Sequence, residues 1–107
     1  YSLADRNLRL EEAEALIVRA LEISPDDPFI LDSLGWVRFR RGDGAAALMH
    51  LERAYAKRQD AEIAAHLGEV LWSLSRRDDA RRILDQALAA HPENTLLVDT
   101  ARRLGIR

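Results

Sequence analysis

The chain of 107 residues contains no cysteine, which excludes disulfide bonds, thiol catalysis and metal sites with cysteine ligands. It also has no run approaching the ~18 apolar residues of a transmembrane helix, so no direct membrane insertion is expected. The opening residues lack the basic-then-apolar pattern of a secretory signal. Residues 1–5 resemble the end of a helix. We therefore expect the chain to be cut from a longer protein, with any targeting signal upstream.

An excess of charge of one sign is lacking too. Sixteen basic residues stand against 18 acidic ones, for a formal net charge of -2 at pH 7. Because phosphate binding needs clustered positive charge, the composition predicts no nucleic-acid partner. Signals for β-hairpins are equally scarce. The Asp43-Gly44 pair lies between two helical patterns, so strands are not expected.

What the chain does contain is an internal repeat with a period of 33 or 34 residues. Ala13, Ala47 and Ala80 follow one another at this interval. The interval also relates other apolar and small residues: Ile17, Leu51 and Leu84; Ala20, Ala54 and Ala87; Leu34-Gly35 and Leu67-Gly68. Such a period indicates stacked helical hairpins that bury their apolar faces against their neighbours. Function in such a protein is expected on a surface and not in a catalytic pocket.

Turn and cap residues keep the same period. Asp27, Asp60 and Asn94 each precede an apolar helical pattern and are predicted to cap it, and Pro28 suits a first helical position. A glycine follows the last periodic residue of two patterns, at Gly42 and Gly105. The predicted helices cover residues 9–23, 28–40, 46–55, 61–74, 80–90 and 95–104.

These residues resemble the tetratricopeptide repeat, a helix-turn-helix unit of about 34 residues. One unit reads Leu34-Gly35, Gly42 and Ala47-x3-Leu51-x2-Ala54, and the next reads Leu67-Gly68, Ala80-x3-Leu84-x2-Ala87 and Pro92. The resemblance implies an all-α, right-handed solenoid of antiparallel helix-turn-helix repeats. Its predicted parts are the second half of a truncated repeat at 1–27, repeats at 28–60 and 61–94, and a capping helix at 95–107. The chain departs from the family pattern at Arg38, Gln59 and Ser75, where an aromatic residue, a loop proline and a turn glycine are usual.

In this family the first helix of each repeat lines a concave groove, and the resemblance implies which side chains face it. The expected partner-binding residues are Phe29, Asp32, Trp36, Phe39 and Arg40 in one repeat and Glu69 and Trp72 in the next. The aromatic residues would supply apolar contact, while the charged ones would set orientation. Apolar patches rimmed by charge commonly mark protein or peptide contacts. The alternative is that Trp36 and Trp72 pack against each other or against upstream repeats.

Signals for chemistry are weak. His50, His66 and His91 are expected to be solvated or to line the groove, and the nearest approach to a metal-ligand set is Glu62-x3-His66-x2-Glu69. Nothing in the pattern separates a pair of acids from solvent for acid-base catalysis. We therefore expect no enzyme activity, no metal and no cofactor.

Two segments are similar to a narrower bacterial group. Leu31-Asp-Ser-Leu-Gly-Trp36 and Ala65-His-Leu-Gly-Glu-Val-Leu-Trp72 resemble the C-terminal repeats of proteobacterial lipoproteins on the outer membrane. Those proteins act as adaptors for a periplasmic carboxyl-terminal processing protease. The resemblance implies a periplasmic protein anchored through an upstream lipoprotein signal, with the cytoplasm as the alternative location.

The expected function is a scaffold or adaptor whose partner is a protein or peptide, such as a protease or its substrate. The Lys/Asn/Arg clamp with which some family members grip chaperone tails is missing at the equivalent positions, so an apolar helix or extended segment is the expected ligand. The alternative is a structural solenoid or homo-oligomer module with no foreign ligand.

Overall fold

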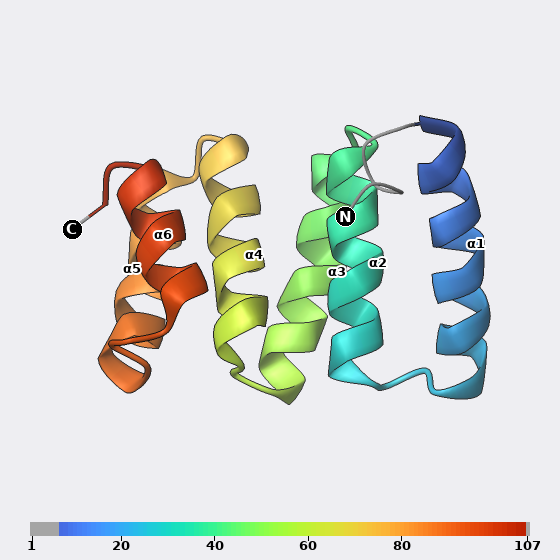
Figure 1. Ribbon diagram of the computed structural model, residues 1–107, viewed down its shortest axis with the longest axis horizontal. Helices are drawn as coiled ribbons and strands as arrows, with labels where there is room; N and C mark the ends of the chain where they lie inside the picture. The colour runs from blue at the N-terminus through green and yellow to red at the C-terminus, as the bar shows by residue number, and fades with distance from the viewer. Residues whose placement is uncertain (1–6, 107) are drawn as a thin grey trace.

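The computed structural model describes residues 7–106, which form a solenoid of helices joined by short turns (Figure 1). No strand occurs in this range, so the expected all-α solenoid is confirmed. The expected helix end at residues 1–5 lies outside the described part of the chain. None of the helices between residues 7 and 106 has both the length and the apolarity needed to span a bilayer. The helices are α1 (Asn7–Ile23), α2 (Pro28–Arg40), α3 (Gly44–Lys57), α4 (Ala61–Ser73), α5 (Arg77–Ala90) and α6 (Thr95–Arg103).

The predicted caps begin the first helix of each hairpin and the last helix of the chain. The Asp27 carboxylate accepts hydrogen bonds from the backbone N–H groups of Phe29 and Ile30, at 2.9 and 3.2 Å. Asp60 does the same one period later, and Asn94 accepts from the N–H of Leu97 at 3.0 Å. These side chains satisfy N–H groups that have no partner inside the helix, so the three predicted caps are confirmed.

The helices α2, α4 and α6 end in one common geometry. The residue after each helix's last turn takes a left-handed backbone, with φ of 88° at Gly42, 65° at Ser75 and 78° at Gly105. The next N–H then bonds to a carbonyl five residues earlier: Asp43 to Arg38, Arg76 to Leu71 and Ile106 to Ala101. Ser75 therefore keeps the turn that glycine makes elsewhere, although the left-handed region costs a residue with a side chain roughly 1–2 kcal/mol.

Close packing inside each hairpin depends on the Leu-Gly pairs. A Cβ atom on Gly35 would lie 2.8 Å from Cγ of Leu51, and one on Gly68 would lie 2.7 Å from Cγ of Leu84. Glycine is therefore the residue that lets α2 meet α3, and α4 meet α5, at this distance. The repeating small and apolar residues of α3 and α5 are buried as their register predicts: Ala47, Leu51, Ala54, Ala80, Leu84 and Ala87.

Packing around α1 differs from that in the two hairpins. Leu16, expected on the apolar stripe, is 66% exposed, because the described residues place no neighbouring helix over that side of α1. The buried side of α1 instead carries Leu10 and Ala13, which form a small cluster with Val37 of α2. The remaining stripe residues are half-buried: Ile17, Ala20 and Leu21.

His50 corrects the expectation that all three histidines are solvated or line the groove. It is buried on α3, and neither ring nitrogen has a hydrogen-bond partner within the described chain. Burial, together with the positive charges of Arg38 and Arg53, lowers its pKa below the ordinary 6.5. His91 is exposed and His66 is half-buried, as expected.

We predict that Gly68→Ala destabilises the protein, because the new methyl group overlaps Leu84. Overpacking of this kind costs about 1–3 kcal/mol. This outweighs the roughly 1 kcal/mol by which alanine favours a helix over glycine. Urea unfolding followed by circular dichroism measures the change. The control is Ala89→Gly on the exposed side of α5, which reports helix propensity alone. Equal stability of Gly68→Ala and wild type would contradict the close contact.

A second prediction concerns acid. The unfolded chain binds a proton at His50 near pH 6.5, whereas the folded protein binds it at a lower pH, so stability falls as the pH falls through 6.5. We expect His50→Leu to raise stability by about 1–3 kcal/mol at pH 7, since it removes two unpaired buried nitrogens. It should also reduce the loss of stability between pH 7 and pH 5. Melting curves at both pH values measure this, with His91→Leu as the exposed control. A loss equal to that of wild type would contradict the prediction.

Candidate functional site

A cavity of about 370 Å³ opens between the first helices of the two hairpins and α1. It brings together three of the seven predicted binding residues, Asp32, Trp36 and Arg40. The rest of its lining comes from α1, α2 and α4: Ile17, Ser33, Val37, Glu62 and His66. We call this surface the α2–α4 face. Its lining mixes aromatic, acidic and basic side chains.

The centre of the α2–α4 face is a polar link between consecutive repeats. Nδ1 of His66 lies 2.8 Å from Oδ1 of Asp32, and because a carboxylate accepts, the ring N–H donates. Both side chains are largely shielded from water, with exposed fractions of 16% and 6%. Hydrogen bonds to a charged group in such an environment are stronger than those on an open surface. The pair therefore ties α2 to α4.

Trp36 holds the histidine ring from one side. The rings of Trp36 and His66 stack with centroids 4.1 Å apart and planes inclined by 22°. Phe39 lies next to Trp36, at 5.2 Å between ring centroids. The Trp36 ring is half-buried, so part of it remains available to a ligand. Stacking and the hydrogen bond to Asp32 together fix the orientation of His66.

The other three predicted binding residues each engage an arginine at another place on the chain. Glu69 pairs with Arg103 of α6 through two hydrogen bonds of 2.7 and 3.2 Å, which raise the pKa of Arg103 above its ordinary value. The guanidinium of Arg58 lies 5.6 Å from the centre of the Phe29 ring. Trp72 is covered by two arginines of α5, Arg77 at 4.7 Å and Arg81 at 5.7 Å.

The two tryptophans thus have different partners. Among the described aromatic contacts, Trp36 meets Phe39 and His66, while Trp72 meets arginines. The structure gives no Trp36–Trp72 stack in residues 7–106. A cation above the ring of Trp72 stabilises it by roughly 0.5–1 kcal/mol at an exposed site.

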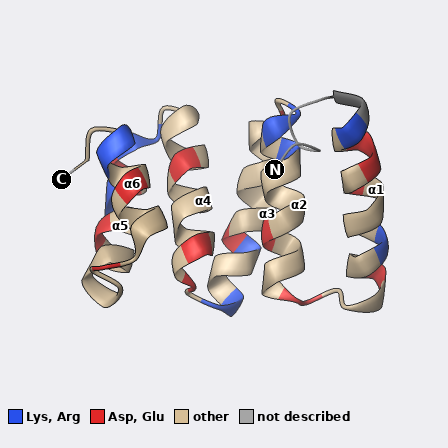
Figure 2. Ribbon diagram, viewed as in Figure 1, with Lys and Arg blue, Asp and Glu red and all other residues tan. Residues whose placement is uncertain are grey.

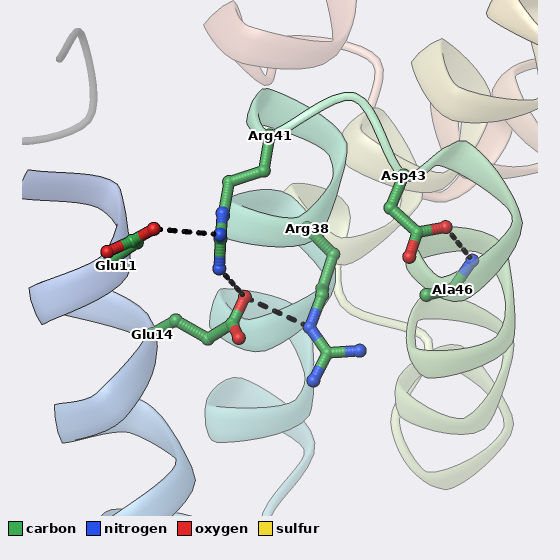
Figure 3. A network of polar contacts seen from close by, with 6 residues as sticks. All are labelled: Glu11, Glu14, Arg38, Arg41, Asp43 and Ala46. Atoms are coloured by element: carbon green, nitrogen blue, oxygen red, sulfur yellow. Dashed lines mark hydrogen bonds and ion pairs between the residues drawn. The ribbon is translucent and has the colours of Figure 1, made fainter. Parts of the chain in front are cut away.

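Ion pairs join α1 to α2 beside this surface (Figure 3). Glu14 lies 3.0 Å from Arg38 and 3.3 Å from Arg41, and Glu11 lies 3.4 Å from Arg41. Arg38, where the family pattern has an aromatic residue, therefore replaces apolar packing with charge. Figure 2 shows both signs of charge spread over the ribbon between residues 7 and 106.

Sequence reasoning expected His66 to be solvated or to line the groove and grouped it with Glu62, but it missed the contact of His66 with Asp32. It aligned the repeats position by position, which equates His66 with Ser33 and hides the diagonal contact from one repeat to the next. The available signal was the spacing of 34 residues between Asp32 and His66, one residue more than the 33 that separate Leu34-Gly35 from Leu67-Gly68.

Comparison with known protein families shows which family the chain belongs to. The model of the tetratricopeptide repeat matches residues 38–103, more than half of the chain. The chain belongs to the tetratricopeptide repeat family. Repeats of this family generally mediate protein–protein interactions and are generally non-catalytic.

A bacterial relative extends the comparison. Over 69 residues, 64% of this chain, the sequence is 51% identical to TPR repeat-containing protein PA4667 of Pseudomonas aeruginosa. The matched segment spans 12% of the length of that protein. The similarity therefore concerns a small part of a much longer tetratricopeptide repeat protein.

We predict that the buried Asp32–His66 pair contributes more to stability than the exposed Glu69–Arg103 pair. Asp32→Ala leaves a shielded ring N–H without an acceptor, at a cost of about 1–3 kcal/mol. Glu69→Ala should cost less than about 1 kcal/mol, because Arg103 is 57% exposed and water replaces the carboxylate. Urea unfolding at pH 7 compares the variants, with Asp32→Asn as a control that keeps an oxygen acceptor. A larger loss in Glu69→Ala would contradict this ranking.

Proposed function

We propose that this chain is a non-catalytic adaptor module that binds a protein or peptide partner on the α2–α4 face. The observation that supports this is the cavity in which Trp36 and Arg40 lie beside the Asp32–His66 pair. A half-buried aromatic ring with charged groups around it provides the apolar anchor and the orienting contacts typical of interaction hot spots.

The remaining predicted contacts would lie at the margins of this surface. Phe39 extends the apolar area from Trp36. Phe29, Glu69 and Trp72 already engage arginines, so a partner would add to those contacts or displace the arginines. Trp36 is therefore the central contact of the proposal. The expected ligand is an apolar helix or extended segment that places one large side chain against this ring.

The narrower form of the proposal is an adaptor for a periplasmic carboxyl-terminal processing protease. Its support is the resemblance of the segments 31–36 and 65–72 to outer-membrane lipoprotein adaptors, one of which contributes Trp36 and the other His66. In that role the partner is the protease or its substrate, and the chain holds them together without chemistry of its own.

A specific observation favours the alternative of a structural or homo-oligomeric module. Leu16 and Ile23 on α1 are 66% and 84% exposed, and large apolar side chains in this state commonly mark a contact surface. A second copy or another repeat of the parent protein would cover them. In this case the α2–α4 face would have no foreign ligand.

The narrower proposal is tested by measuring whether this chain binds the carboxyl-terminal processing protease encoded in the same genome. The protease is purified in a catalytically inactive form. We expect Trp36→Ala to weaken binding at least tenfold, because truncation of a central tryptophan typically costs about 2 kcal/mol or more. Interferometry measures the affinity, and Met49→Ala, exposed on α3, is the matched control. Thermal melting of Trp36→Ala beside Leu34→Ala, whose core cavity costs about 2–5 kcal/mol, separates binding from folding.

The outcomes distinguish the forms of the proposal. No binding of the protease to the wild-type chain rejects the protease-adaptor role. A peptide library then tests the general role, because selected peptides must lose affinity for Trp36→Ala and keep it for Met49→Ala. Peptides that bind both variants equally reject the α2–α4 face. Concentration-dependent dimers in light scattering that Leu16→Asp abolishes would support the homo-oligomer.

A further inference from the structure

Three side chains with metal-ligating atoms converge on the α2–α4 face. Asp32 comes from α2, Glu62 and His66 come from α4, and one ligand atom of each lies within 4.8 Å of the other two. All three residues line the cavity of about 370 Å³. A cavity of this volume has room for an ion with bound water. This cluster shares Glu62 and His66 with the Glu62-x3-His66-x2-Glu69 pattern of the sequence, whereas Glu69 pairs with Arg103 and Asp32 is the third member.

The charge of this cluster favours a cation. Two carboxylates lie close together, and one of them, Asp32, is buried. Two negative charges this close repel each other, and a positive ion between them removes the repulsion, although water partly screens the exposed Glu62 carboxylate. Arg40, the one basic side chain in the described lining, supplies a single positive charge against the two negative ones.

The donor set indicates the kind of cation. Two carboxylate oxygens alone would suit Mg²⁺ or Ca²⁺, whereas an imidazole nitrogen selects Zn²⁺ and neighbouring transition metals. Zinc sites with three protein ligands and an open fourth position also combine histidine with a carboxylate, in the ratio of two histidines to one carboxylate, whereas this cluster has one histidine and two carboxylates. We propose that Asp32, Glu62 and His66 form a binding site for a divalent transition-metal ion of the Zn²⁺ type.

Two of the three proposed ligands, Asp32 and His66, already lie next to each other. The oxygen of Asp32 and Nδ1 of His66 are 2.8 Å apart, and the stacked ring of Trp36 holds the imidazole in place. An ion bound here would replace the proton that Nδ1 donates to Asp32, and the neutral ring would then carry its proton on Nε2. Ligands of a tetrahedral zinc ion with bonds of about 2.0–2.1 Å lie roughly 3.3 Å from each other. Glu62, exposed on the first turn of α4, must close the remaining distance by a change of rotamer.

Binding would join one repeat to the next. The ion would connect α2 directly to α4, the first helices of the two hairpins. Because metal binding to the native state alone raises its stability, the melting temperature of the chain should rise with metal concentration. This inference is independent of the partner-binding proposal. Binding of a partner can be measured separately on metal-free protein in the presence of a chelator.

Calorimetric titration of the metal-free chain with Zn²⁺ tests the site. We expect one ion per chain, a dissociation constant in the micromolar range and a higher melting temperature. Glu62→Gln should weaken binding at least tenfold, and it keeps the fold because Glu62 is exposed. His66→Gln should abolish binding. His91→Gln, an exposed histidine outside the cluster, is the matched control and should bind as wild type does.

Other results would overturn the proposal. Absence of saturable Zn²⁺ binding below millimolar concentration rejects the site, as does binding that His91→Gln removes and Glu62→Gln leaves unchanged. Binding of Mg²⁺ as tight as that of Zn²⁺ would show that the imidazole does not select the ion. Zinc binding by Asp32→Asn is interpreted only if its melting curve shows that this variant folds. If Asp32→Asn unfolds, the result with Glu62→Gln decides.

Discussion

The contact between a glycine of one helix and a leucine of the next sets the geometry on which the rest of the structure depends. Gly35 meets Leu51, and Gly68 meets Leu84, at distances that leave no space for a methyl group. This contact brings the two helices of a hairpin together and fixes how each is rotated. Once α2 and α4 have that rotation, Asp32 of one repeat meets His66 of the next. The arrangement of the α2–α4 face is thus a consequence of core packing.

The sequence predicted the fold well because the signals that specify it are local and periodic. The caps at Asp27, Asp60 and Asn94 act within three residues of themselves, so their chemistry is visible in the sequence. The exposed Leu16 and buried His50 were missed, because their burial depends on which neighbouring helix is present and not on their own helical register.

The candidate site was less predictable, since it is built from contacts between repeats. Family resemblance placed Asp32, Trp36 and Arg40 on one surface, and they do line a common cavity. Whether a charged residue such as Glu69 is available to a partner depends on a side chain 34 residues away, Arg103. Long flexible arginines reach several possible acceptors, so hydrophobic register alone does not determine their pairing.

The ion-paired boundary between α1 and α2 has a consequence for how the solenoid unfolds. In a linear array, cooperativity depends on the coupling between nearest neighbours. Apolar packing joins α3 to α4 within one continuous cluster. The helix α1 is held by a separate small cluster, by Leu21 against the main cluster, and by the ion pairs of Glu11 and Glu14. The exposed pair of Glu11 is weakened by salt, the part-buried pair of Glu14 with Arg38 is weakened less, and apolar contacts are not weakened in this way. The attachment of the first helix to the array therefore depends on ionic strength more than the packing of the two hairpins against each other does.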